Sequence, residues 1–116
     1  MSIHRINPGP RMSQAAVHGG VVYLAGQVAD DPSADVAGQT RQILGKIDAL
    51  LAEAGSDKSG ILSTTVWLAD IATFAEMNSV WDAWVDKASP PPRATVEARL
   101  AAPAFRVEIA AIAAQA

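Results

Sequence analysis

The sequence has no cysteine, only two histidines and few charged residues. Without cysteine the chain can form no disulfide and no zinc–thiolate site, and nothing marks an oxidising compartment, so we expect a cytoplasmic protein. His4 and His18 stand alone, and the acidic pair Asp30-Asp31 lacks the spacing of metal ligands. We therefore expect neither a metal site nor a serine-type catalytic triad.

Charge and hydrophobicity exclude two further classes. The 116 residues carry a net charge of −3 without any run of lysine or arginine, which argues against nucleic-acid binding. No apolar run approaches the roughly 18 residues of a membrane span, and no basic-then-apolar leader is visible, so we expect no membrane association. Half of the residues are hydrophobic and only 18% are charged, an apolar surplus that predicts self-association of a single domain spanning residues 1–116.

The first half of the chain predicts three strands and a helix. An edge strand lies within residues 1–10, and Gly19-Gly20 predicts a tight hairpin between strands at 12–18 and 21–27. Apolar residues then recur every three or four positions over 35–54, which indicates a helix. Ser33 or Asp35 can cap its first turn, and Gly55 stands where a left-handed cap is expected.

The second half predicts a strand, a helix and two more strands. The strand covers 61–69, and a helix capped by Asp70 follows and ends at the proline run 90–92. Phe74, Trp81 and Trp84 lie at helical spacing and are expected in the core. The final strands cover 93–100 and 105–112. The economical fold is α+β, with two helices on one face of a mixed sheet and another subunit on the other face.

Strand alternation assigns faces to the last two strands. We expect one apolar face of each strand to cover the helices, formed by Ala94, Val96, Ala98 and Leu100 in the first and by Phe105, Val107, Ile109 and Ala111 in the second. Arg93, Thr95 and Glu108 then gather on the opposite face, where the subunit contact is expected.

Glu108 and Arg93 each allow two interpretations. Glu108 is the only charged residue from 107 to 114, so it is either a structural salt-bridge partner of Arg106, Arg99 or a neighbouring chain, or a general acid/base. Arg93 follows three prolines, which fixes its backbone and suits bidentate capture of a carboxylate, but a lone arginine is also common as a surface residue. Asn78 is typical of a polar helix surface.

Pro91-Pro92-Arg93-Ala94-Thr95-Val96, followed by Val107-Glu108-Ile109, resembles the signature of the RidA/YjgF family of reactive-intermediate deaminases. Further similarities run through the whole chain in family order, among them Gly26-Gln27, Thr64-Thr65-Val66, and Phe74 with Asn78. Arg11-Met12-Ser13 and the segment 81–84 are similar to a subgroup distinct from the archetypal enzyme.

The resemblance implies a chorismate-mutase-like α+β fold assembled as a homotrimer, with ligand sites in clefts between subunits. It implies hydrolysis of 2-imino or 2-enamino acids to 2-oxo acids and ammonia, without metal or organic cofactor. Arg93 matches the arginine that grips the substrate carboxylate, and Glu108 matches the glutamate that orients or activates water. Asn78 matches an asparagine near the site, and Gly26 matches a glycine that lines the pocket.

Three positions depart from the archetype. Thr95 replaces a cysteine, so a thiol role is excluded while the hydroxyl can still hold a water. Ala25 replaces a serine and removes a donor, and Met12 falls near the position of a tyrosine. The alternative function is a non-catalytic trimer that binds small carboxylates or partner proteins through Arg93; a purely structural interaction module is a third.

Overall fold

The computed structural model describes residues 2–116 as one six-stranded mixed sheet with two α-helices. The sheet order is β1-β2-β3-β6-β4-β5, in which β4 and β5 are parallel and all other neighbours are antiparallel. The strands are β1 (His4–Ile6), β2 (Ala15–His18), β3 (Val21–Leu24), β4 (Ile61–Leu68), β5 (Arg93–Glu97) and β6 (Val107–Ala114). The helices are α1 (Val36–Glu53) and α2 (Phe74–Trp84), with short 3-10 turns η1 (Lys58–Gly60) and η2 (Ile71–Thr73).

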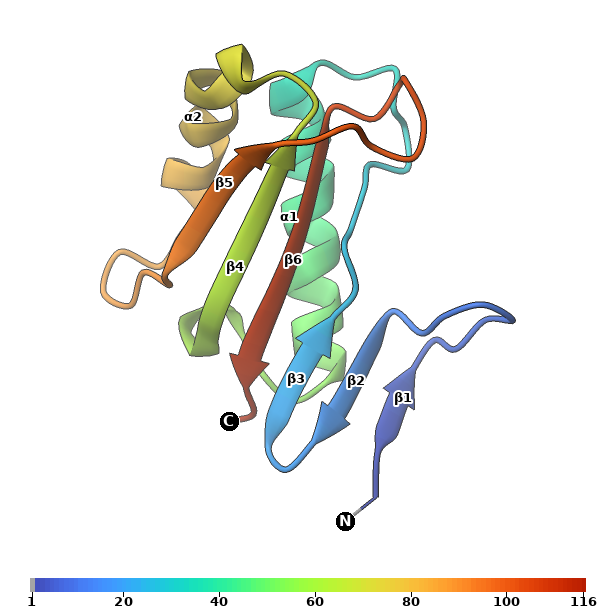
Figure 1. The fold of residues 1–116 in the computed structure, drawn as a ribbon. Helices are drawn as coiled ribbons and strands as arrows, with labels where there is room; N and C mark the ends of the chain where they lie inside the picture. Colours follow the sequence, from blue (N-terminus) through green and yellow to red (C-terminus); the bar gives the residue numbers. More distant parts are fainter. Residues whose placement is uncertain (1) are drawn as a thin grey trace.

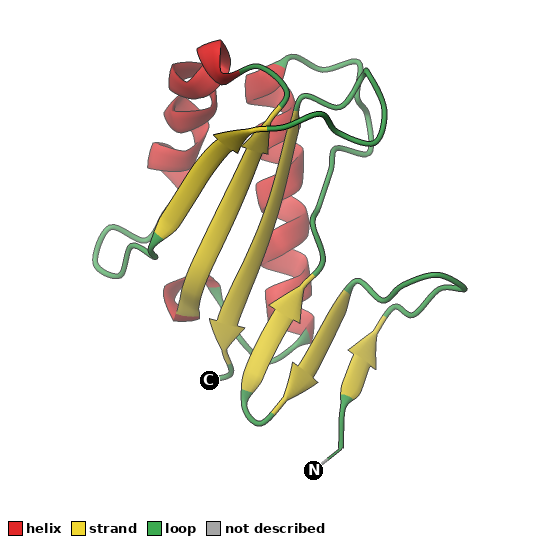
Figure 2. Ribbon diagram, in the orientation of Figure 1, coloured by secondary structure: helices red, strands yellow, loops and turns green. Residues whose placement is uncertain are grey.

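Both helices cover the same face of the sheet, and the other face is bare (Figure 1). Figure 2 shows the resulting two layers, with the strands in front of the helices. The core lies between the layers, where Ile43, Ile47 and Leu51 of α1 meet Val66 of β4 and Ile109 of β6, all at most 1% exposed. The expected fold class is confirmed, including the helices on one face. Within residues 2–116, no helix is both long and apolar enough to span a membrane.

The expected hairpin and first helix are confirmed. Gly19 and Gly20 have φ angles of 58° and 77°, the left-handed conformation that a two-residue turn between twisted strands requires. Asp35, not Ser33, caps α1, because its carboxylate accepts a hydrogen bond from the Gly38 N–H at 2.8 Å. Gly55 follows the helix with a φ of 78°.

The second helix differs from the expectation at both ends. Asp70 caps η2 by accepting a hydrogen bond from the Ala72 N–H, whereas α2 begins only at Phe74 and has no side-chain cap. The helix ends at Trp84, well before the prolines, because the chain becomes extended at Val85. Phe74 was expected in the core but is 42% exposed, since it lies at the first helical position and only Met77 and Trp81 of α2 are buried.

The prediction that Arg93 and Thr95 lie on the same face as Glu108, away from the helices, is wrong. In the parallel pairing of β5 with β4, Arg93 lies beside Thr64 and Thr95 beside Val66, and both of those β4 residues are buried beneath the helices. Glu108 pairs instead with Trp67, on the bare face. The register therefore puts Arg93 and Thr95 on the helix side of the sheet and Glu108 on the opposite side. Ala94 and Val96 are the β5 residues that join Glu108 on the bare face.

Candidate functional site

The Glu108 carboxylate lies directly against Gly26. A Cβ atom added to Gly26 would be 2.1 Å from Glu108 Oε2, so no side chain fits there while Glu108 keeps this position. The approach is fixed by backbone pairing of the adjacent residues: the Gln27 N–H donates to Ile109 O at 2.8 Å, and the Ile109 N–H donates back at 3.1 Å. The structure thus brings together two residues of the expected site, Gly26 and Glu108.

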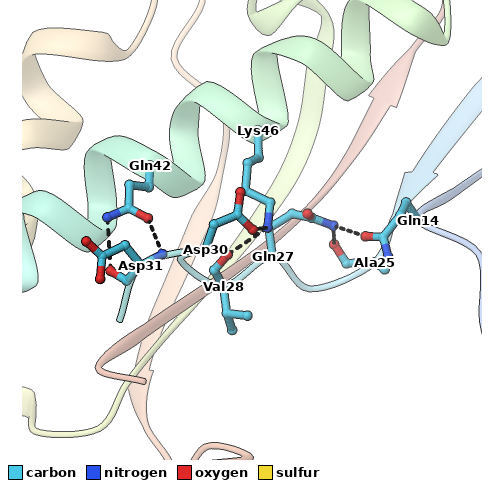
Figure 3. Close-up of polar contacts among 8 residues, drawn as sticks. All are labelled: Gln14, Ala25, Gln27, Val28, Asp30, Asp31, Gln42 and Lys46. Carbon is cyan, nitrogen blue, oxygen red and sulfur yellow. Dashed lines mark hydrogen bonds and ion pairs between the residues drawn. The ribbon is translucent and has the colours of Figure 1, made fainter. Parts of the chain in front are cut away.

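Polar contacts join the segment from Ala25 to Asp31 to Gln14 on one side and to Gln42 and Lys46 of α1 on the other (Figure 3). Gln27 is buried, and its side-chain amide donates to Gln14 Oε1 and to Ala25 O, each at 3.0 Å. Lys46 of α1 donates to Val28 O at 2.9 Å. These contacts fix the backbone that lies against Glu108. The sequence pointed to Gln27 only through the Gly26-Gln27 similarity and gave its side chain no role. The signal available was its position directly after Gly26 in an apolar strand, where an amide must find partners if it is buried.

Further contacts anchor the next part of the same loop to α1. Lys46 Nζ pairs with Asp30 Oδ1 at 2.9 Å, and Gln42 exchanges two hydrogen bonds with the backbone of Asp31. The Lys46–Asp30 contact is the only salt bridge among residues 2–116, so the expected alternative of an intrachain Glu108 pair with Arg106 or Arg99 does not occur there.

Arg93 lies on the helix side of the sheet, where its side chain contacts α2. Its guanidinium carbon is 4.9 Å from the centre of the Trp81 ring and 5.7 Å from that of Phe74, and Nη1 is 3.9 Å from the Met77 sulfur. The start of β5 is pinned because Pro92 O accepts from both the backbone N–H and the hydroxyl of Thr64. Helical spacing predicted Phe74 and Trp81 as core residues, so their contact with Arg93 was not expected from the sequence.

Partial burial lowers the pKa of the Arg93 guanidinium, and the charge of Asp82 offsets part of that effect. An arginine nevertheless stays protonated in proteins, so Arg93 is a half-buried cation. Thr95, two residues further along the same face, has a buried hydroxyl without a hydrogen-bond partner in residues 2–116. A cation and a free donor on one face suit an anionic ligand.

The remaining expected site residues fall at different places. Asn78 is half-buried on α2, and Ala25 is half-buried beside Gly26, whereas Met12 is 49% exposed in the β1–β2 loop. The described residues contain no group of three or more His, Asp or Glu side chains placed to hold a metal ion.

Arg93 and Glu108 do not converge within one chain. They lie on opposite faces, and the β4 partners Thr64 and Trp67 place them three residues apart along the strand direction, about 10 Å. A concavity of about 760 Å³ between Glu97 and the β5–β6 loop is lined by neither of them. The chain thus carries Arg93 with its surroundings on one face of the sheet and Glu108 with Gly26 on the other, and we call them the cationic and the anionic half-site of the candidate site.

Comparison with known proteins decides the family. Residues 2–115 match the family described as Endoribonuclease L-PSP. A RutC family protein of Haemophilus influenzae is 48% identical over 114 residues, covering 97% of this chain and 98% of the relative. The RutC family protein YoaB of Escherichia coli is 44% identical, with 98% and 99% covered.

The chain belongs to the RidA/YjgF family. Among solved structures, NMB1025 of Neisseria meningitidis, a member of the YjgF protein family, superposes with a TM-score of 0.97 at 44% identity, covering 100% of this chain and 97% of that one. Yeast Mmf1 shares the fold at 24% identity and a TM-score of 0.91, covering 99% of this chain and 100% of that one. Family membership confirms the resemblance from which Arg93 and Glu108 were chosen as candidate site residues. Their roles can now be proposed on the RidA/YjgF fold.

Proposed function

We propose that the protein is a hydrolytic deaminase of 2-imino and 2-enamino acids, and that its active site forms between subunits of a homotrimer. The observation that carries the proposal is the separation of Arg93 and Glu108 on opposite faces of one sheet. Both lie in the segments that resemble the family signature, and two subunits in contact can bring the cationic half-site of one to the anionic half-site of the other.

The bare face of the sheet supports assembly. Tyr23, Val96 and Ile112 point out of that face and are 47%, 45% and 36% exposed. Water contact of this much apolar surface on one face is typical of a protein interaction site. Glu108 belongs to the same face, so a subunit packed there would cover the Glu108 carboxylate and exclude bulk water from it.

In this mechanism Arg93 pairs with the substrate carboxylate and fixes the imine carbon near the neighbouring subunit's carboxylate. Thr95 lies on the face of Arg93, so its free hydroxyl serves the carboxylate end or a water bound there. Glu108 accepts a proton from water as the oxygen adds to the carbon of the protonated imine, which gives a carbinolamine. Glu108 then returns this proton to nitrogen. As the C–N bond breaks, the hydroxyl oxygen forms the carbonyl and gives its proton to Glu108, and ammonia and the 2-oxo acid leave.

A small carboxylate suits the charges of this chain better than a polynucleotide. The chain has 9 basic and 12 acidic residues and no basic run, whereas binding a polyphosphate backbone requires several cations on one surface. The cationic half-site offers one arginine, which matches one carboxylate.

The direct test measures hydrolysis of 2-iminobutyrate generated in situ by a dehydratase. Arg93→Ala should abolish the acceleration, and Glu108→Gln should still bind 2-oxobutyrate while losing about 100-fold or more in kcat. Unchanged activity in Arg93→Ala would refute the proposal. If the wild type binds 2-oxobutyrate without accelerating hydrolysis, the protein is the non-catalytic carboxylate binder instead.

A further inference from the structure

The residues around Arg93 form an aromatic support that the signature motif does not include. Both ring centres lie within the roughly 6 Å at which a cation is attracted to an aromatic face, Trp81 at 4.9 Å and Phe74 at 5.7 Å. An arginine over an aromatic ring can stack on it with the flat face of its guanidinium. The five N–H donors point outward in the plane of the group, so contacts with its face leave them available.

Arg93 has little other support within its own chain. The Met77 sulfur, at 3.9 Å, is a weak acceptor, and no carboxylate of residues 2–116 forms a salt bridge with Arg93. A long arginine side chain without an anchor would sample many rotamers, and binding would then have to oppose that loss of entropy. The two rings reduce this freedom before a ligand arrives.

Trp81 is itself fixed, which makes it suitable as a support. It is 6% exposed and packs on Trp84, with the ring centres 5.3 Å apart and the planes inclined at 55°. Trp84 in turn donates from its indole nitrogen to Asp48 Oδ2 of α1 at 3.0 Å. The position of the Trp81 ring is therefore tied to the rigid helix layer.

We infer that Trp81 and Phe74 are positioning residues that hold the Arg93 guanidinium by its faces and leave its N–H edge free for the carboxylate of a 2-imino or 2-oxo acid. The part concerning the carboxylate rests on the proposed function; the part concerning Arg93 does not. Trp81 is the stronger support because it is closer and buried, whereas Phe74 is farther from Arg93 and more exposed.

Nuclear magnetic resonance tests the support without any substrate. The Arg93 Nε–H signal, assigned by its loss in Arg93→Lys, should be shifted by the ring current of Trp81 in the wild type. Trp81→Phe should keep most of this shift and Trp81→Leu should lose it. Trp84→Leu is the matched control: it removes a similar ring from the same helix and the packing that this ring gives Trp81, but the Trp81 ring itself stays, so the shift should fall less than in Trp81→Leu. Equal signals in Trp81→Leu and the wild type would overturn the inference, as would equal loss in both leucine variants.

Calorimetric titration with 2-oxobutyrate then tests the consequence for binding. Trp81→Leu should raise the dissociation constant for 2-oxobutyrate by about tenfold, and Trp81→Phe should raise it by no more than about threefold. In the imine assay the change should appear mainly in KM, because the proton shuttle of Glu108 is untouched. Equal weakening by Trp81→Leu and Trp84→Leu would show a general loosening of α2 and contradict the inference. If the wild type binds no 2-oxo acid, the proposed function and the carboxylate role fail together, while the resonance of Arg93 still decides whether the rings hold it.

Discussion

Glu108 and Gly26 form the most restrictive contact of the candidate site. The carboxylate occupies the place where any side chain at residue 26 would begin. Gly26 does not have a positive φ, so its backbone conformation is open to other residues. The requirement for glycine therefore comes from the neighbour alone, and it connects the backbone after β3 to the proposed general base.

Gly26→Ala should displace Glu108 and lower kcat/KM by about 100-fold, the lower end of what a positioned base contributes. The free energy of unfolding should change by no more than about 0.5 kcal/mol, because the far end of a glutamate side chain can rotate away. Imine hydrolysis and urea unfolding measure the two effects.

Gly45→Ala is the control for Gly26→Ala. Gly45 lies in α1 with open space around the position of a Cβ atom, so this change should leave activity intact and stabilise the protein by about 0.5–1 kcal/mol. Full activity in Gly26→Ala would show that the position of Glu108 is not needed for the reaction.

Asp57 gives a pH-dependent contribution to stability. Hydrogen bonds from the Ser59 hydroxyl and, next, from its backbone N–H lower the pKa of the Asp57 carboxyl from the usual 3.8. A lowered pKa means that the folded state favours the carboxylate. The contribution is present above the unfolded-state pKa and is lost as the pH falls through the lowered value.

Ser59→Ala removes the hydroxyl that lowers the pKa of Asp57 most. The variant should be less stable than the wild type at about pH 6, and the difference should shrink as the pH falls below the usual pKa of 3.8 and through the lowered pKa of Asp57. Urea unfolding across this range measures it. If the difference in the free energy of unfolding between the two proteins stays constant with pH, the serine acts by packing alone.

At the scale of elements, the sequence predicted each strand and helix but misassigned a face. Alternation in β5 separates Arg93 and Thr95 from Ala94 and Val96, and the apolar pair was expected beneath the helices. Both faces of this sheet have apolar side chains, because the bare face also carries Tyr23 and Ile112. When two faces are suited to burial, alternation shows that two sides exist but cannot say which one the helices cover.

The same limit applies to the aromatic stripe of α2. Helical spacing correctly placed Trp81 in the core, but it does not predict which strand residue contacts the aromatic side chains of α2. That contact depends on the parallel pairing of β4 with β5, a long-range feature that brings Arg93 beside α2. The signature identified Arg93 by family resemblance, and its support became visible only in the folded chain.

The cap of α1 gives a prediction at this scale. Asp35→Ala should lower the free energy of unfolding by about 1 kcal/mol, because the N–H of Gly38 loses its acceptor. Ser33→Ala should change it by no more than about 0.5 kcal/mol, since the Ser33 hydroxyl bonds to Asp31 and not to the helix. Thermal and urea unfolding report both values, and a larger effect at Ser33 would contradict the assigned cap.

For the whole molecule, the surplus of apolar residues has a location. A chain with 50% hydrophobic and 18% charged residues buries one set between sheet and helices and presents another on the bare face. The anionic half-site belongs to that face, and the cationic half-site lies beyond β4 on the other. Composition, the apolar face and the separated half-sites all fit one account, in which assembly completes the site.

Ile112→Lys should disrupt this assembly. A charge in the middle of the bare face would be buried without a partner in the proposed trimer, so the variant should elute as a monomer and lose imine hydrolase activity. Ala52→Lys, on the exposed side of α1, is the control and should remain a trimer. Light scattering after size exclusion measures the mass, and an Ile112→Lys trimer would contradict the placement of the interface.

The most direct test of a shared site mixes two inactive variants. Arg93→Ala subunits retain Glu108, and Glu108→Gln subunits retain Arg93, so a site between one of each can be intact. After unfolding and refolding together in equal amounts, about a quarter of the sites should be intact, because each of the two positions is native about half of the time. We predict recovery of about a quarter of wild-type 2-iminobutyrate hydrolysis; a mixture as inactive as its components, beside an active wild type refolded in the same way, would contradict the shared site.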